Sequence, residues 1–155
     1  MQITKVNSLL LDTNVWLDYF MGEGPSLAEI SRLVACGQTN SLTLLYTPTA
    51  AKDLFYIIPR RLRMRCGSAD ISCAPAAQAC LERMMEIAVA APLSFPECEL
   101  ARMLSKKLPD FEDALIVAAA QAAKADFIVT QDKVFLAQVP EVCITPARAV
   151  ELLSL

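Results

Sequence analysis

Asp110-Phe-Glu-Asp-Ala-Leu-Ile-Val-Ala-Ala-Ala120 is the stretch that decides how this chain of 155 residues folds. Its spacing predicts a helix in which Asp110 is the N-cap, Asp113 shares its face, and Glu112 points elsewhere. The residues after Asp113 leave no polar stripe, so the body of the helix should be buried. The helix dipole alone could account for Asp110. An unpaired carboxylate one turn inside a buried helix is costly, and a metal ion is one way to hold Asp113 there.

Short apolar runs flank this helix and end in polar residues. Ser8-Leu-Leu-Leu-Asp12 and Asp126-Phe-Ile-Val-Thr130 each predict a buried strand. Ser41 to Tyr46 and Val142 to Ile144 predict two more, and Leu93 to Phe95 a brief one. Because helical segments alternate with these strands, the sequence predicts an α/β fold with a mainly parallel sheet.

The expected helices have recognisable ends. Thr47-Pro48 and Thr145-Pro146 each read as an N-cap followed by proline at the first helical position. Pro59 should end or kink the helix that begins at Pro48. Residues 66–72 read as a turn or linker. The predicted helices are 12–20, 26–36, the segment from 48 to Pro59, 74–91, 96–107, 110–120, 133–137 and the segment from 145 to the C-terminus.

Composition predicts one domain over residues 1–155. Hydrophobic residues make up 55% and mean hydropathy is +0.41, so a sizeable core is expected. No apolar run reaches the ~18 residues that span a bilayer, and the N-terminus lacks a secretory cleavage pattern, so a cytoplasmic protein is expected. The six cysteines form no Cys-x-x-Cys pair and histidine is absent. Reduced core cysteines are therefore expected, and zinc sites of the usual kinds are disfavoured.

Charge restricts where a nucleic acid could bind. The net charge of −3 and pI of about 5.0 give no overall attraction for a polyanion, so any contact must be local. The only dense basic cluster is Arg60, Arg61, Arg63 and Arg65. In a helix Arg61 and Arg65 share a face that Arg60 and Arg63 do not. A solvated surface and a phosphate-contact site explain this cluster equally well.

Four aspartates could form one site. Asp12 and Asp132 each follow a predicted strand, and parallel strands present their C-terminal ends at one edge, where ligands bind. Asp53 and Asp113 lie on predicted helices. Taken alone, Asp12 is better explained as an N-cap. Together the four offer oxygen ligands without His or Cys, which suits Mg²⁺ or Mn²⁺.

Three segments together resemble the PIN domain family. They are Leu-Leu-Leu-Asp12-Thr-Asn14, Asp110-Phe-Glu-Asp113-Ala-Leu-Ile-Val-Ala-Ala-Ala, and Ala125-Asp-Phe-Ile-Val-Thr130-Gln-Asp132-Lys-Val-Phe. The resemblance covers nearly the whole chain and implies a three-layer α/β/α sandwich. It also implies a small nuclease, since single-domain bacterial members are mostly the toxins of VapBC toxin–antitoxin pairs.

The resemblance also implies roles for individual residues. Asp12, Asp113 and Asp132 would bind metal, and Asn14 and Thr130 would support the site. Asp53 stands where the family usually has Glu, one methylene longer, and Asp110 would be an accessory acid. The implied activity is Mg²⁺- or Mn²⁺-dependent hydrolysis of RNA, with single-stranded or looped RNA as substrate. The implied partners are an antitoxin and a second copy in a homodimer, and the four arginines are the candidate RNA contacts.

Other classes fit the sequence less well. A haloacid-dehalogenase-like phosphatase needs a second acid two residues after the first, where this chain has Asn14. A phosphoacceptor receiver domain needs an acidic pair at the end of its first strand, and Asp12 has no acidic neighbour. A PIN-like interaction module with a decayed site remains the main alternative, because Asp53 departs from the family pattern.

Overall fold

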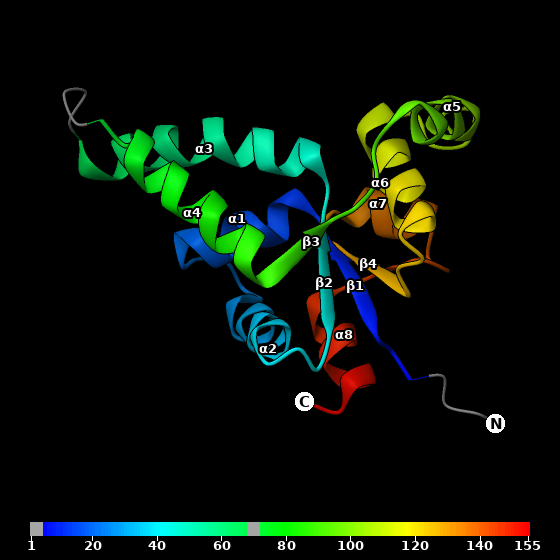
Figure 1. The fold of residues 1–155 in the computed structure, drawn as a ribbon, viewed down its shortest axis with the longest axis horizontal. Helices are drawn as coiled ribbons and strands as arrows, with labels where there is room; N and C mark the ends of the chain where they lie inside the picture. Colours follow the sequence, from blue (N-terminus) through cyan, green and yellow to red (C-terminus); the bar gives the residue numbers. More distant parts are fainter. Residues whose placement is uncertain (1–4, 68–71) are drawn as a thin grey trace.

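The structure is a computed structural model in which residues 5–67 and 72–155 are described, and it has a β-sheet between two layers of helices (Figure 1). The predicted turn at 66–72 and the N-terminal segment lie partly outside the described residues. The elements in chain order are β1 (Ser8–Leu11), α1 (Thr13–Met21), α2 (Leu27–Gln38), β2 (Thr43–Tyr46), α3 (Pro48–Cys66), α4 (Ala74–Ile87), β3 (Ala88–Ala90), α5 (Phe95–Leu104), α6 (Phe111–Ala122), β4 (Phe127–Val129), α7 (Lys133–Gln138), β5 (Cys143–Ile144) and α8 (Pro146–Leu153).

The sheet is parallel throughout, with the strand order β3-β2-β1-β4-β5. In the central strand, Leu9 aligns with Leu44 of β2 on one side and with Phe127 of β4 on the other. The chain builds outward from β1 through β2 to β3, and then returns to the other side of β1 with β4. The strand order therefore reverses between β1 and β4, and such a reversal is where α/β folds leave a crevice.

The leucines of β1 divide between the two helical layers. Leu9 and Leu11 belong to the core formed with α1, α2, α3, α4 and α8, whereas Leu10 packs with Leu45 and Ile128 against α6 and α7. All three β1 leucines are at most 1% exposed. A strand covered on both faces needs an unbroken apolar run, which is why this run predicts a parallel sheet. The predicted three-layer architecture is confirmed.

Several helix starts also agree with the sequence. The side chain of Thr47 accepts a hydrogen bond from the Ala50 backbone nitrogen at 3.1 Å, as an N-cap before Pro48 should. The Asp110 side chain accepts from the Glu112 nitrogen at 2.8 Å. These bonds satisfy N–H groups that the first turn of a helix leaves without a partner.

Of the two outcomes predicted for Pro59, an end or a kink of its helix, the end is wrong, because α3 runs on to Cys66. Beyond the proline, Leu62 packs against the core, and the Arg65 guanidinium donates to the Met21 carbonyl at 3.0 Å. These contacts are made far along the sequence, so a local reading of proline cannot include them.

The chain between α4 and α5 also differs from expectation. The helix predicted to reach Ala91 ends at Ile87, and the next three residues form β3 by pairing with β2. Pairing along a sheet edge overrides the helical preference of an alanine-rich run. The strand predicted at 93–95 is absent: Phe95 begins α5, where the Glu97 carboxylate accepts bonds from the Ser94 nitrogen and hydroxyl, both at 2.7 Å.

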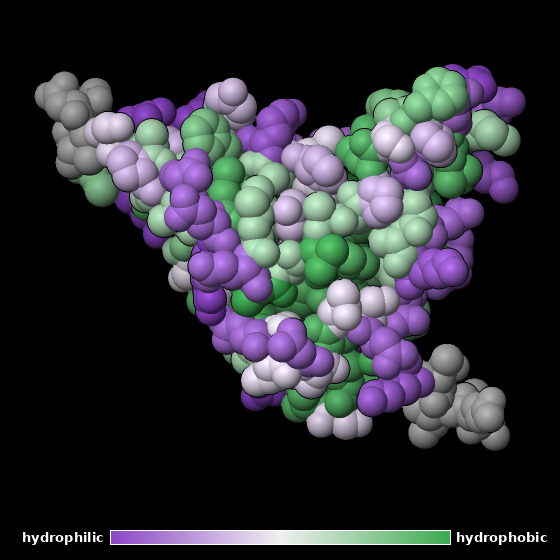
Figure 2. Space-filling view, viewed as in Figure 1, coloured by the Kyte–Doolittle hydropathy of each residue, from purple (hydrophilic) through white to green (hydrophobic). Residues whose placement is uncertain are grey.

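The helices form two projections. α3 and α4 run side by side away from the sheet, and α5 packs on α6 at the other end of the view (Figure 1). The surface is indented between these projections (Figure 2). No helix within residues 5–67 and 72–155 is long and apolar enough to cross a membrane. The cysteines at 36, 66, 80, 98 and 143 carry free thiols.

Candidate active site

Asp12 lies where β1 ends, and only 8% of the residue is exposed. Its Oδ1 accepts a hydrogen bond from the Thr13 backbone nitrogen at 2.7 Å. Its Oδ2 accepts from the Asn14 amide at 2.8 Å and from the Thr130 hydroxyl at 2.7 Å. Burial raises the pKa of Asp12 and outweighs these three bonds, which lower it. The carboxylate is thus fixed in one position at the edge of the sheet.

Asn14 and Thr130 join the ends of the two strands that flank the reversal in strand order. The Asn14 amide oxygen accepts from the Gln131 backbone nitrogen at 3.1 Å, and the Asn14 nitrogen approaches the Thr130 hydroxyl at 3.3 Å. The same hydroxyl accepts from the Asp132 nitrogen at 3.0 Å while donating to Asp12. Thr130 is completely buried. These two side chains therefore set the positions of both Asp12 and Asp132.

Asp132 is the N-cap of α7. Its Oδ1 accepts from the backbone nitrogens of Val134 and Phe135, at 2.8 and 3.2 Å. Within the described residues its Oδ2 accepts no hydrogen bond, so this oxygen keeps its capacity to bind a ligand. The charge of Asp132 also acts at a distance, because it raises the pKa of both Asp12 and Asp113. Asp132 is thus close enough to these two acids to belong to the same site.

Asp113 is the least compensated acid of the group. It lies in the first turn of α6, is half-buried, and makes no hydrogen bond or ion pair within residues 5–67 and 72–155. Partial burial raises its pKa to about 7, and the charges of Asp110, Asp12 and Asp132 add to that effect. A carboxyl that is half protonated near neutral pH is a common feature of functional sites.

The aspartates Asp12, Asp53, Asp113 and Asp132 are called the acidic edge below, and Glu112 and Lys52 adjoin it. Glu112 hydrogen-bonds with Asp53 of α3, and burial, followed by the charge of Asp53, raises the pKa of Glu112. The Lys52 ammonium pairs with Asp53 at 2.9 Å. The local spacing within α6 shows only that Glu112 leaves the face of Asp110 and Asp113. It contains no signal that α3 lies opposite.

Cys143 at the start of β5 is the cysteine whose pKa responds to the charges of Asp12 and Asp113. Burial, followed by the charges of Asp12 and Asp113, raises the pKa of its thiol to about 12. The thiol therefore stays protonated at neutral pH and supplies no thiolate ligand. Among the described residues of the site, carboxylates are therefore the anionic groups available to a ligand.

These donors match the chemistry of a hard divalent cation. Carboxylate oxygens are the ligands that Mg²⁺ and Mn²⁺ prefer. Burial is the main cause of the raised pKa of Asp12 and Asp113, and the charges of neighbouring acids raise both further. A cation would favour the charged carboxylates and relieve the part that comes from repulsion. As the side chains lie, no three acidic or cysteine side chains of the described segments are gathered tightly enough to hold an ion. Closing around a cation therefore requires side-chain movement, which Asp113 can make because no hydrogen bond fixes it.

The structure separates the four arginines of the basic cluster. Arg61 and Arg65 both pair with Glu23 in the loop after α1. Arg60 is exposed and Arg63 half-buried, and neither makes an ion pair with a described residue. The cluster is thus divided between one pair that anchors α3 and another that is available for contact.

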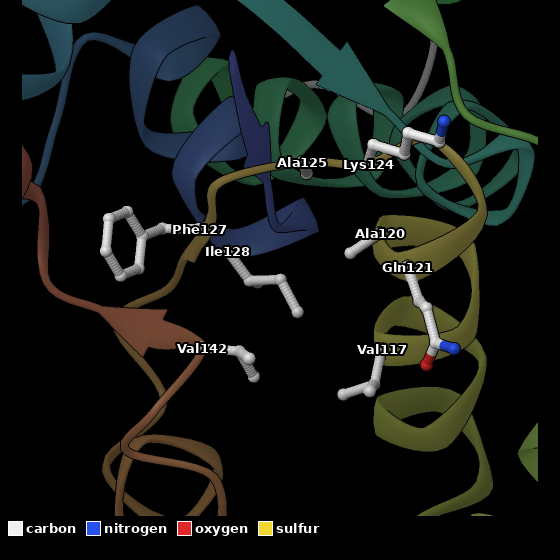
Figure 3. A pocket seen from close by; sticks show the side chains of 8 residues that line it. All are labelled: Val117, Ala120, Gln121, Lys124, Ala125, Phe127, Ile128 and Val142. Atoms are coloured by element: carbon white, nitrogen blue, oxygen red, sulfur yellow. The ribbon is translucent and has the colours of Figure 1, made fainter. Parts of the chain in front are cut away.

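A separate apolar pocket of about 400 Å³ lies away from the acids (Figure 3). Its walls come from the C-terminal half of α6 and from the residues around β4 and β5. They are Val117, Ala120, Gln121, Lys124, Ala125, Phe127, Ile128 and Val142. None of the candidate site residues lines it, so this pocket is not part of the acidic edge.

The sequence model of the PIN domain matches residues 8–134 of this chain. The match begins with β1 and extends past Asp132, so it contains Asp12, Asp53, Asp113 and Asp132. Among curated proteins, no sequence matches this chain significantly.

Three solved structures have a similar fold. A toxin–antitoxin complex from Klebsiella pneumoniae includes a chain with a TM-score of 0.63 and 16% identity, covering 89% of this chain and 97% of that one. The structure of VapBC2 from Rickettsia felis, bound to a DNA fragment from its promoter, includes a chain with a TM-score of 0.60 and 18% identity, covering 89% of this chain and 98% of that one. A protein from Pyrobaculum aerophilum has a TM-score of 0.58 and 18% identity, and the match covers 98% of this chain and 94% of that one.

Proposed function

Because this chain belongs to the PIN domain family, we propose that its acidic edge is the active site of a metal-dependent ribonuclease. The observation that carries the proposal is that carboxylates from separate parts of the chain lie near enough to act on one another's charge, with the pKa of Asp113 raised to about 7. A structural role alone would not place so many mutually repelling acids together.

In this proposal Asp12, Asp113 and Asp132 hold Mg²⁺ or Mn²⁺, and Asp53 and Asp110 complete the negative surroundings. A divalent cation at these oxygens would polarise a phosphodiester and lower the pKa of an attacking water. Asp12 can serve without rearrangement because its three hydrogen bonds already fix it. Asp113 is free to turn toward the ion.

The polar neighbours have positioning roles. Thr130 and Asn14 hold Asp12 through their hydrogen bonds, and Thr130 also holds the backbone of Asp132. Supporting contacts of this kind orient ligands and typically change metal affinity or activity by roughly 10–100-fold when removed. With no histidine in the chain, proton transfer from the attacking water falls to the carboxylates.

The biological setting is part of the same proposal. Toxin–antitoxin complexes are among the solved structures with this fold. We propose a cytoplasmic toxin whose partner is an antitoxin protein, whose substrate is single-stranded or looped RNA, and which forms a homodimer.

Incubation with total RNA tests the proposal. Wild-type protein should cut RNA with Mg²⁺ or Mn²⁺ and not with EDTA. Asp113→Asn should reduce the rate by several orders of magnitude, because it deletes one ligand charge and keeps the side chain's size. Glu86→Gln, which neutralises an acid on α4, is the matched control and should cut like wild type.

Wild-type rates in a folded Asp113→Asn protein would contradict the metal site. Absence of cleavage by any form would favour the interaction module with a decayed site. Mapping the cut ends of the RNA would identify the preferred sequence.

A further inference from the structure

The arginines of α3 that pair with Glu23 and those without an ion pair in the described chain lie on different faces of the helix. At 3.6 residues per turn, successive side chains are about 100° apart. Lys52, Tyr56, Arg60 and Arg63 therefore fall within an arc of roughly 80°, which is called the α3 track below. Arg61 is about 180° around the helix from Lys52. The arginine cluster thus contains two sets that differ in their helix face and in their ion pairs.

The α3 track carries positive charge, and three of its four residues are exposed, while Arg63 is half-buried. The side chain of Lys52 is 65% exposed and Tyr56 is 64% exposed. Arg60 is exposed as well, and neither Arg60 nor Arg63 pairs with an acid of the described segments. By contrast, Arg61 and Arg65 pair with the same carboxylate, that of Glu23. In a protein of net charge −3, Arg60 and Arg63 are thus two cations on one helix face without an ion pair in the described chain.

The track starts at the acidic edge. Lys52 pairs with Asp53 at 2.9 Å, and the charge of Glu112 also acts on it. From there α3 leads away from the sheet toward the end of the α3–α4 projection (Figure 1). Arg63 comes eleven residues after Lys52, so the two are about 16 Å apart along the helix axis at a rise of about 1.5 Å per residue, a span of a few nucleotides. A single-stranded nucleic acid bound along this face of α3 would therefore reach the acidic edge directly.

We propose that the α3 track binds the backbone of single-stranded RNA on one side of the scissile bond, with Lys52, Arg60 and Arg63 contacting phosphates and Tyr56 stacking on a base. This inference rests on the proposed function and adds the path of the substrate. Cations at helical spacing with an aromatic ring between them match the pattern of single-strand binding surfaces. An acidic protein segment would use the cations but not the ring, so the Tyr56 side chain favours RNA.

Paired variants test the two components. Arg60→Ala with Arg63→Ala should raise KM for a short labelled oligoadenylate at least tenfold and leave kcat nearly unchanged. The slope of log affinity against log salt should become shallower by about 1.4, because each phosphate contact on a single strand contributes about 0.7. The charge-matched control, Arg83→Ala with Arg148→Ala, removes two exposed arginines elsewhere and should change neither quantity.

Tyr56 provides a readout that charge does not explain. Tyr56→Leu should weaken binding of the oligoadenylate with no change in the salt slope, whereas Tyr56→Phe should restore it, because only the ring is required. Melting temperatures equal to wild type would verify that each variant is folded.

The outcomes separate the track from the proposed function. If wild type cuts RNA but the arginine double variant matches its control in KM and salt slope, the proposed RNA binding by the α3 track is wrong, and the proposed ribonuclease activity is kept. If wild type neither cuts nor binds RNA, both fail. Unchanged RNA binding with lost binding of polyglutamate would replace the RNA by an acidic protein segment and overturn the inference.

Discussion

Asp113 is the residue whose ionisation most directly reports on the site. Its pKa is raised to about 7 in the folded protein, against 3.8 for an ordinary aspartate. A carboxyl with a raised folded-state pKa binds more protons folded than unfolded between these two values. Stability of the metal-free protein should therefore fall as pH rises from about 4 to about 7, with the full loss present above pH 7.

Melting curves at several pH values check this dependence. In EDTA, wild type should melt at a lower temperature at pH 8 than at pH 5. Asp113→Asn should show a smaller decrease, because its side chain does not titrate, although Asp12, also raised, retains a contribution of the same sign. Equal pH slopes for the two proteins would show that burial and the neighbouring acids do not raise the pKa of Asp113 in the folded protein.

Thr130 tests the positioning of Asp12. Thr130→Val keeps the shape but removes the hydroxyl that donates to Asp12 and accepts from the Asp132 nitrogen. We expect a loss of about 1–3 kcal/mol in stability and roughly 10–100-fold in RNA cleavage. Thr130→Ser should recover most of both. Denaturant unfolding and cleavage assays measure the two effects, and unchanged cleavage by Thr130→Val would exclude the positioning role.

For individual residues, the sequence predicts which acids are candidates for the site better than it predicts the contacts between acids on different helices. Asp12, Asp113 and Asp132 follow strand ends or a helix start, and their positions follow from the parallel sheet. The contact between Glu112 and Asp53 depends on how α3 packs opposite α6. Periodicity within either helix carries no information about this packing.

Among the elements, α3 carries an internal proline that its surroundings tolerate. Pro59 lacks the N–H that would bond within the helix, at a cost of about 3 kcal/mol in a helix interior. Pro59→Ala should restore that bond. It should also make the unfolded chain more flexible, which offsets part of the gain in stability. We expect a net stabilisation of roughly 2 kcal/mol, measured by denaturant unfolding. A destabilised variant would indicate that α3 is shaped around the proline.

Helix starts that depend on hydrogen bonds between residues close in sequence can be predicted from the sequence. Elements that depend on pairing with a distant segment cannot. Thr47-Pro48 and Asp110 begin helices because their side chains bond to nitrogens two or three residues on. The strand β3 exists because β2 lies beside it. Ser94 and Glu97 did carry a local signal, since Ser-x-x-Glu is the sequence pattern of a capped helix start. That signal gives the start of α5 correctly.

At the scale of the whole molecule, exposed apolar side chains favour self-association. Large ones are exposed on α4, β3 and α5: Met85 at 54%, Val89 at 60%, Phe95 at 78% and Met103 at 62%. A second copy that covered such side chains would remove their apolar surface from water. We expect a dimer by light scattering, and a monomer at high concentration would count against it.

The central claim, that acids from separate elements hold one divalent cation, is tested most directly by melting with Mn²⁺. An ion that binds only the folded protein at about 100 times its dissociation constant adds about 2.7 kcal/mol of stability. Wild type and the surface control Glu86→Gln should both show a large rise in melting temperature, and Asp113→Asn a much smaller one. Equal shifts in wild type and Asp113→Asn, or no shift in any of the three, would contradict the account.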